Sequence, residues 1–175
     1  YYTNREIRNN RTTKKIYVKM QNKLSCLTIN TDASFHPEQK VGGYAFYIIC
    51  DLFKIEKAGK FKANPKSSID AEMKCFGNAI ATILAQKELP KIKKIVFNTD
   101  CLNGVACVTS KKNKSKDEQL IVSLINNLKS RTHCRDFEFR HVKAHNGTAD
   151  SRSWVNDKLD KEAKKWMRKQ LKREL

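Results

Sequence analysis

Long apolar runs are missing from this chain of 175 residues. No stretch approaches the roughly 18 apolar residues that a membrane-spanning helix needs, and the N-terminal residues lack the charged-then-apolar pattern of a secretory signal. We therefore expect no membrane partner, and we expect an intracellular, cytoplasmic protein. The chain does not begin with Met, which is compatible with its being part of a larger polypeptide.

Cysteine motifs that bind metal are also missing. The six cysteines are widely spaced, no two of them form a CxxC pair, and no histidine follows at zinc-finger spacing. Such cysteines are typical of free thiols in a reducing compartment. With 39% hydrophobic and 31% charged residues, the composition excludes wholesale disorder and predicts one folded domain.

Acidic residues are only half as frequent as basic ones, 18 against 36, which gives a formal net charge of +18. The segments 1–23, 109–117 and 158–175 contribute +6, +3 and +5 of this charge. A surface of this kind favours a polyanionic partner, although solvated lysine-rich helix faces would give the same composition.

The hydrophobic pattern predicts a basic arm over residues 1–23 and a single folded domain over residues 24–175. Strands rich in aromatic and β-branched residues alternate with helices whose apolar residues recur at three and four. This alternation favours an α/β fold with a mixed sheet covered by helices. The expected order is βββαβααβα, over residues 24–34, 41–50, 51–62, about 68–84, 93–100, 102–108, 120–128, 136–142 and 155–170.

Three of the scarce acids lie at the ends of apolar elements. Asp32 follows one strand, Asp100 ends another, and Glu72 lies in the first turn of a helix. Taken singly, they have ordinary explanations, because aspartate forms turns and a helix N-terminus stabilises a carboxylate by about 0.3–1 kcal/mol. Carboxylates at the ends of neighbouring strands would nevertheless converge, and their mutual repulsion is relieved by a divalent cation.

Oxygen-only ligand sets are those that Mg²⁺ and Mn²⁺ prefer. Two such ions about 3.5–4 Å apart can bind both the attacking and the leaving oxygen of a phosphodiester. An acidic, cation-binding site within a strongly basic protein therefore predicts a nuclease.

Several short motifs resemble those of the ribonuclease H type I family, over residues from Leu24 to about Leu171. They occur in the family's order: TDAS with GGYAFYI, then AEM, NTD, VKAHNG and NDKLDKEAKK. The resemblance implies the ribonuclease H-like fold, a five-stranded mixed sheet in which an antiparallel meander is followed by parallel strands, flanked by helices. It also implies hydrolysis of the RNA strand of an RNA/DNA hybrid by two Mg²⁺ ions, for which Mn²⁺ can substitute, leaving 5′-phosphate and 3′-hydroxyl ends.

The resemblance further implies which residues form the site. The four metal ligands and catalytic carboxylates would be Asp32, Glu72, Asp100 and Asp160. Asp157 competes with Asp160, but the family's N-acid-x-x-D pattern, counted from Asn156, favours Asp160. His145 aligns with a loop histidine that assists proton transfer or product release; the alternative is a solvated loop histidine.

Contacts with the substrate match the family less completely. The stretch FHPEQKV has no asparagine where the family commonly has one, and Ser68 stands where the family often has asparagine. The residues expected to bind nucleic acid are Ser34, Ser68, Lys111, Lys112, Lys114 and Lys143. Two alternatives therefore stay open: a nuclease of the same fold with another duplex preference, and a non-catalytic basic nucleic-acid-binding module. We expect a monomer without a small-molecule organic cofactor.

Overall fold

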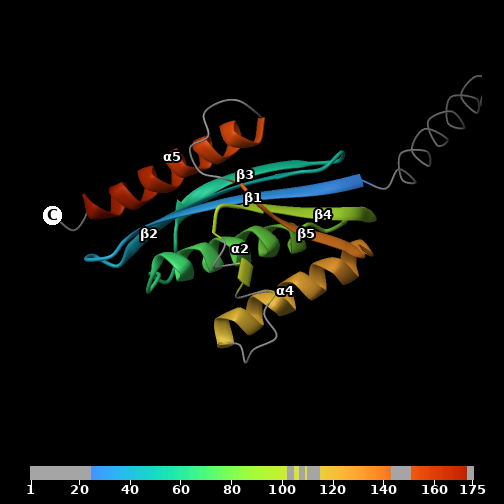
Figure 1. Cartoon of the computed structure of the whole chain (residues 1–175), viewed down its shortest axis with the longest axis horizontal. Coiled ribbons are helices and arrows are strands. Elements are labelled where there is room, and N and C mark those ends of the chain that lie inside the picture. Colours follow the sequence, from blue (N-terminus) through green and yellow to red (C-terminus); the bar gives the residue numbers. More distant parts are fainter. Residues whose placement is uncertain (1–24, 102–104, 107–108, 110–114, 143–150, 173–175) are drawn as a thin grey trace, which may run out of the picture.

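A five-stranded mixed sheet runs through the centre of the computed structural model (Figure 1), with the strand order β3-β2-β1-β4-β5. The strands β1 (Ser25–His36), β2 (Val41–Ile49) and β3 (Lys54–Lys60) form an antiparallel meander, while β4 (Ile92–Thr99) pairs parallel with β1 and β5 (Asp136–His141) pairs parallel with β4. The predicted fold, an antiparallel meander followed by parallel strands, is confirmed. The structure describes residues 25–101, 105–106, 109, 115–142 and 151–172.

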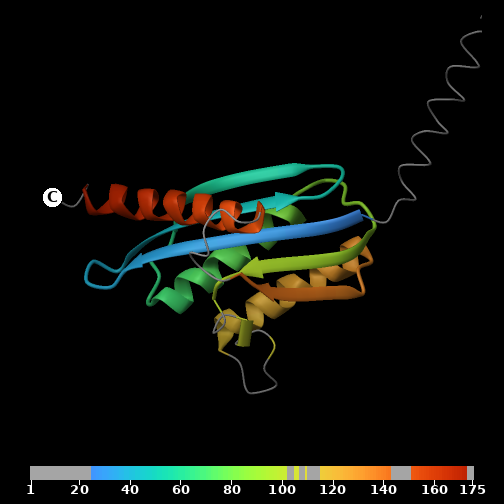
Figure 2. The same cartoon turned by 45° about the horizontal axis from the view of Figure 1, so that its top comes forward.

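Helices cover both faces of the sheet (Figure 2). The helices α2 (Ser68–Leu84) and α4 (Lys116–Thr132) lie together on one face, and α5 (Ser151–Leu171) lies alone on the other. No helix within the described residues is long and apolar enough to cross a membrane. The predicted arm over residues 1–23 and most of the predicted short helix over residues 102–108 lie outside the described residues.

The larger hydrophobic core lies between the sheet and the α2–α4 pair. Alternate strand residues point into it, and Ile29, Phe46 and Phe97 are fully buried there. The rings of Phe76 and Phe97 meet edge to face with their centroids 4.9 Å apart. This packing holds α2 against the central strands, which later matters for the position of its first turn.

Side-chain caps determine where α2 and α4 begin. The Ser67 hydroxyl accepts a hydrogen bond from the Asp70 amide and starts α2 one residue later, as predicted. Ser115 and Glu118 form a reciprocal capping box at the start of α4. The predicted apolar face of α4 is correct except at Leu120, which is 59% exposed because the buried face follows Ile121 instead.

The double glycine of β2 allows α5 to approach the sheet closely. A Cβ atom added at Gly43 would lie 2.2 Å from the Ala163 carbonyl oxygen and 2.7 Å from the Met167 amide nitrogen. The Gln170 side chain reaches across the same contact and donates to the Gly42 carbonyl at 2.7 Å. The strand register continues through both glycines, so they serve close backbone approach rather than a bulge.

Gly43→Ala should therefore destabilise the protein by about 1–3 kcal/mol, since the new methyl group would overlap backbone atoms that cannot move without displacing α5. Urea unfolding followed by circular dichroism measures the loss. Gly59→Ala is the matched control, because its added Cβ would lie 3.1 Å from the end of the Tyr44 side chain and should cost less. Wild-type stability of Gly43→Ala would contradict the close packing of α5.

Candidate active site: a carboxylate cluster

The register of the central strands brings two aspartates together. Asn30 of β1 pairs with Asn98 of β4 in the parallel ladder. Asp32 and Asp100 each follow two residues later, so they lie next to each other just beyond the last paired residues. The side-chain amide of Asn98 donates through Nδ2 to Asn30 Oδ1 at 2.8 Å and thereby links the two strands two residues before the aspartates.

Glu72 joins the aspartates from the first turns of α2. Its Oε1 atom accepts a hydrogen bond of 3.0 Å from the Ala33 amide, in the residue after Asp32. Its Oε2 atom is buried and has no hydrogen-bond partner among the described residues. The capped start of α2 and its packing on the sheet therefore place the Glu72 carboxylate beside the aspartates, with one buried oxygen that accepts no hydrogen bond from the described residues.

Oxygen atoms of Asp32, Glu72 and Asp100 lie within 4.8 Å of one another. Asp32 is 5% exposed and Glu72 is 8% exposed, while Asp100 is half-buried. Residues separated by as many as 68 positions thus meet where the pairing of β1 with β4 ends, and Asp32 lies within β1 because this strand continues along β2 to His36. The sequence-based expectation that these three acids converge agrees with this geometry.

The cluster changes the protonation of its members. Burial, followed by the negative charges of Asp100 and Asp160, raises the pKa of Asp32 from 3.8 to about 8. Burial and the charges of Asp32 and Asp100 raise the pKa of Glu72 well above its usual value of 4.5. The hydrogen bonds of the Ala33 amide oppose both shifts without overcoming them. Without a cation, the site holds protons at neutral pH.

Asp160 lies on α5, on the face of the sheet opposite α2, and the group of carboxylates within 4.8 Å does not include it. Its charge contributes to the raised pKa of Asp32, whereas Asp157 makes no comparable contribution. Lys164 forms an ion pair of 2.8 Å with Asp160 and also lowers the pKa of Asp32. Asp157 instead pairs with exposed Lys161 at 3.3 Å. The electrostatics therefore favour Asp160 over Asp157 as the α5 member of the cluster.

The remaining predicted residues are two serines on the elements that carry Asp32 and Glu72, and five residues outside the described part of the chain. Ser34 of β1 donates to the Met167 sulfur at 3.3 Å, and Ser68 is exposed at the start of α2. The predicted proton-transfer residue His145 and the predicted nucleic-acid-binding lysines lie outside the described residues; these lysines are Lys111, Lys112, Lys114 and Lys143.

Two residues near the cluster were not anticipated from the sequence. Lys164 follows Asp160 by four positions on the same helix, a spacing that could have signalled the ion pair. Cys75 is fully buried beneath Asp32 and donates to the Asp32 carbonyl at 3.4 Å. Nothing in the sequence distinguishes this thiol from an ordinary core residue, since its role depends on how α2 packs on β1.

The donor atoms of the cluster fit a hard divalent cation. All are carboxylate oxygens, which Mg²⁺ and Mn²⁺ prefer, and one of them, Glu72 Oε2, is buried with no hydrogen bond among the described residues. The raised pKa values of Asp32 and Glu72 show that protein groups alone do not compensate the negative charge. Asp32, Glu72 and Asp100 could therefore hold a metal ion, with Asp160 at the side.

The sequence matches the model of the RNase H family over residues 25–168. The chain therefore belongs to the RNase H family and is a ribonuclease H enzyme. Comparison with curated proteins finds no significant match.

Solved structures support the same fold. LC11-RNase H1, solved in complex with an RNA/DNA hybrid, superposes with a TM-score of 0.59 at 14% identity, covering 83% of this chain and 99% of that one. RNase H1 from the halophilic archaeon Halobacterium salinarum gives 0.56 at 12% identity, covering 82% and 98%. The protease-reverse transcriptase of prototype foamy virus gives 0.55 at 14% identity, covering 82% of this chain but 21% of that polypeptide.

Asp32→Asn should stabilise the metal-free protein, and the gain should grow with pH. Between about pH 4 and pH 8 the folded protein binds a proton at Asp32 that the unfolded chain has lost, so the free energy of unfolding falls as pH rises through this window. The asparagine variant escapes this loss and should gain on the order of 2–4 kcal/mol near pH 9. Urea unfolding in EDTA at about pH 5 and about pH 9 measures the difference, with Asp157→Asn as control. An equal gain at both pH values would contradict the raised pKa.

Divalent metal should stabilise the wild-type protein, because it binds the folded cluster and not the unfolded chain. Metal at about 100 times its dissociation constant adds about 2.7 kcal/mol, and each kcal/mol raises the melting temperature of a protein of this size by about 2–4 °C. Thermal unfolding with and without millimolar Mg²⁺ or Mn²⁺ measures the shift. Glu72→Gln should shrink it, and Asp157→Asn should preserve it. A wild-type protein that shows no shift would count against a metal site.

Proposed function

We propose that this ribonuclease H hydrolyses the RNA strand of RNA/DNA hybrids with two divalent cations, Mg²⁺ or Mn²⁺, held by Asp32, Glu72, Asp100 and Asp160. The products would carry 5′-phosphate and 3′-hydroxyl ends. Residues 24–175 would form the catalytic domain, and residues 1–23 a basic arm with affinity for phosphates.

The observation that carries this proposal is the convergence of three carboxylates within 4.8 Å, just beyond the point where the pairing of β1 with β4 ends, in a member of a family of nucleases. Buried carboxylates at this separation destabilise a folded protein unless they bind a cation or are protonated. A surface charge of +18 attracts a polyanion to the same molecule. A domain that only bound nucleic acid would gain nothing from carboxylates facing phosphates.

The residues around the cluster have separable tasks in such a reaction. Glu72 is held by the Ala33 amide, so its second oxygen stays directed into the cluster. Lys164 offsets part of the negative charge of Asp160 and would keep that carboxylate from repelling the substrate phosphate. His145 would assist proton transfer or product release from its loop.

Bound divalent cations would supply a more acidic water and stabilise the charge that develops on the leaving oxygen. The balance of the hydrolysis is simple: the water oxygen bonds to phosphorus, the bond from phosphorus to the 3′ oxygen breaks, and that oxygen takes up a proton. By holding the cations, the carboxylates would position the attacking water and the phosphate, which lowers the entropic part of the barrier.

RNA/DNA hybrid is the preferred substrate in this proposal. The structurally similar LC11-RNase H1 was solved with such a hybrid, and this supports the assignment by analogy of fold. Because 2′-hydroxyl contacts distinguish RNA from DNA, the absent family asparagines make duplex preference the point that most needs a direct test.

Asp32→Asn should reduce cleavage of the RNA strand by at least about 100-fold, since even outer-shell changes at metal sites typically cost 10–100-fold. Gel analysis of an end-labelled hybrid in Mg²⁺ measures the rate, and EDTA should abolish it. Asp157→Asn is the matched control on the outer side of α5 and should cleave at nearly the wild-type rate.

The same gels should compare a hybrid, double-stranded RNA and double-stranded DNA of one sequence. Preferential cleavage of the RNA strand of the hybrid supports the proposal. Faster cleavage of either other duplex would assign a different substrate to the same site. Cleavage that persists after both Asp32→Asn and EDTA would rule out the carboxylate site.

A further inference from the structure

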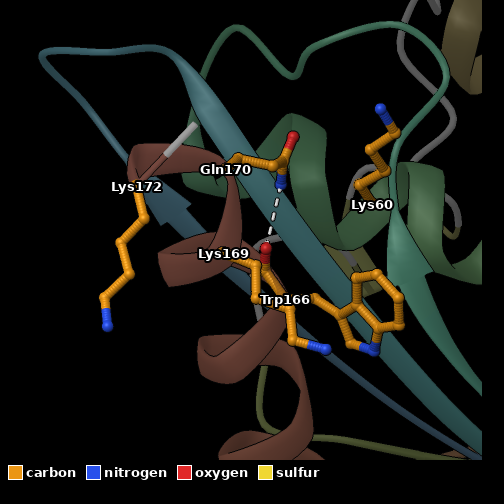
Figure 3. Close-up of a pocket in the computed structure, with 5 residues that line it drawn as sticks. All are labelled: Lys60, Trp166, Lys169, Gln170 and Lys172. Carbon is orange, nitrogen blue, oxygen red and sulfur yellow. Dashed lines mark hydrogen bonds between the residues drawn. The ribbon is translucent and has the colours of Figure 1, made fainter. Parts of the chain in front are cut away.

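A second concave site lies beside the C-terminal half of α5 (Figure 3). The cavity has a volume of about 340 Å³ and lies between the end of β3 and the last turns of α5. Its walls are almost entirely carbon. The residues that line it are Lys60, Trp166, Lys169, Gln170 and Lys172.

An indole ring with one ammonium group beside it dominates this cavity. Lys169 Nζ lies 4.4 Å from the centroid of the Trp166 ring, while Lys60 of β3 lines the cavity with its ammonium group directed away from the indole (Figure 3). Lys172 extends away from the indole, on the other side of Gln170 (Figure 3). The cavity therefore combines a flat aromatic surface with three positive charges and no acidic residue.

Within the described residues, the Lys169 ammonium contacts the Trp166 ring, and no acid pairs with a lysine of the cavity. Along α5, the three acids Asp157, Asp160 and Glu162 are each paired with a lysine other than those of the cavity. No ion pair among the described residues involves Lys60, Lys169 or Lys172. These side chains are exposed, so their ammonium groups can meet an anion from solution.

The cavity is anchored to the same helix as the catalytic cluster. Trp166 follows Asp160 by six residues, which is about 9 Å along the helix axis. The close contact of α5 with β2 through Gly43 holds this part of the helix rigidly on the sheet, and the Gln170 amide adds hydrogen bonds to the Gly42 and Trp166 carbonyls. The site is thus preorganised and lies at a fixed distance from the carboxylates.

We propose that this cavity binds one nucleotide of single-stranded nucleic acid, with the base against the Trp166 indole and the flanking phosphates on Lys60, Lys169 and Lys172. Single-strand sites combine a basic groove with an aromatic surface on which bases stack, and both components are present here. An acidic peptide would match the lysines but leave the apolar walls and the indole without a flat partner. A duplex keeps its bases stacked inside and cannot offer one.

This binding goes beyond the proposed cleavage and does not depend on it. A substrate with a single-stranded extension would have its duplex at the carboxylates and its extension across α5 in the cavity. The proposal therefore assigns to the enzyme a preference for hybrids that end in, or adjoin, a single strand.

The chain contains two tryptophans, which makes a direct test possible. Trp154 is 57% exposed on the first half of α5 and lies outside the cavity, so Trp154→Phe leaves Trp166 as the sole fluorescent reporter. The experiment adds a single-stranded 12-mer of mixed sequence, as DNA and as RNA, to this variant in EDTA. Stacking should quench the Trp166 emission with either sugar, while Trp166→Phe, which retains only Trp154, should show no saturable quenching.

Affinity for a dye-labelled 12-mer, measured by fluorescence anisotropy, gives a second reading. Trp166→Ala should weaken binding by roughly five- to 100-fold, the range for loss of one stacked base. Lys60→Ala combined with Lys169→Ala changes two exposed side chains and should reduce the slope of log affinity against log salt by about 1. Lys161→Ala, on the same helix but outside the cavity, is the control for loss of one positive charge elsewhere on α5 and should leave the Trp166 quenching intact.

Four outcomes would overturn the proposal: no quenching of Trp166 by the single strand, equal quenching by a blunt duplex, equal quenching by inorganic phosphate, and equal quenching by poly-glutamate. All measurements are made without metal and are repeated in Asp32→Asn. A failure of cleavage and a failure of this binding site are therefore distinguishable.

Discussion

The mutual repulsion of the buried carboxylates is the constraint on which the rest of the structure depends. At 4.8 Å and an effective dielectric constant of 20, two unit charges repel by about 3–4 kcal/mol. Three such pairs would cost about as much as the whole stability of an ordinary domain, which is 5–15 kcal/mol. Asp32, Glu72 and Asp100 cannot all stay ionised in this place unless a cation or protons share their charge. The raised pKa values of Asp32 and Glu72 correspond to the alternative in which protons share the charge. A bound divalent cation would be the other alternative.

The fold holds these groups together by contacts that do not involve the charges themselves. The β1–β4 register, reinforced by the Asn30–Asn98 hydrogen bond, brings Asp32 and Asp100 side by side. The hydrophobic core fixes α2 against the sheet, so that its first turn faces the same point. Gly43 lets α5 approach from the other face. Since each element is held by its own packing, the cluster can remain electrostatically unfavourable without unfolding the protein.

Much of this was predictable from the sequence, and the reasons for the exceptions are physical. Apolar periodicity and the short motifs predict the strands, the helices and the carboxylates, because these depend on local pattern and on family resemblance. Leu120 was placed on the wrong side of α4, since adjacent apolar residues shift the apparent stripe by one position. The roles of Lys164 and Cys75 depend on which face of a helix meets which strand. The cavity around Trp166 needs β3 and the end of α5 to meet, residues more than 100 positions apart.

The two flanks of α5 resolve an apparent conflict between an acidic site and a basic protein. Metal binding needs concentrated negative charge, whereas a polyanionic substrate needs positive charge close by. On α5, Asp160 faces the cluster and has Lys164 beside it, while the opposite flank carries Lys169 and Trp166 with no acid in the cavity. The helix thus separates the charges by direction instead of by distance. In the proposed complex, the exposed lysines of the opposite flank would contact phosphates while the carboxylates bind cations at the cleavage site. This arrangement follows from helical periodicity and the close approach at Gly43.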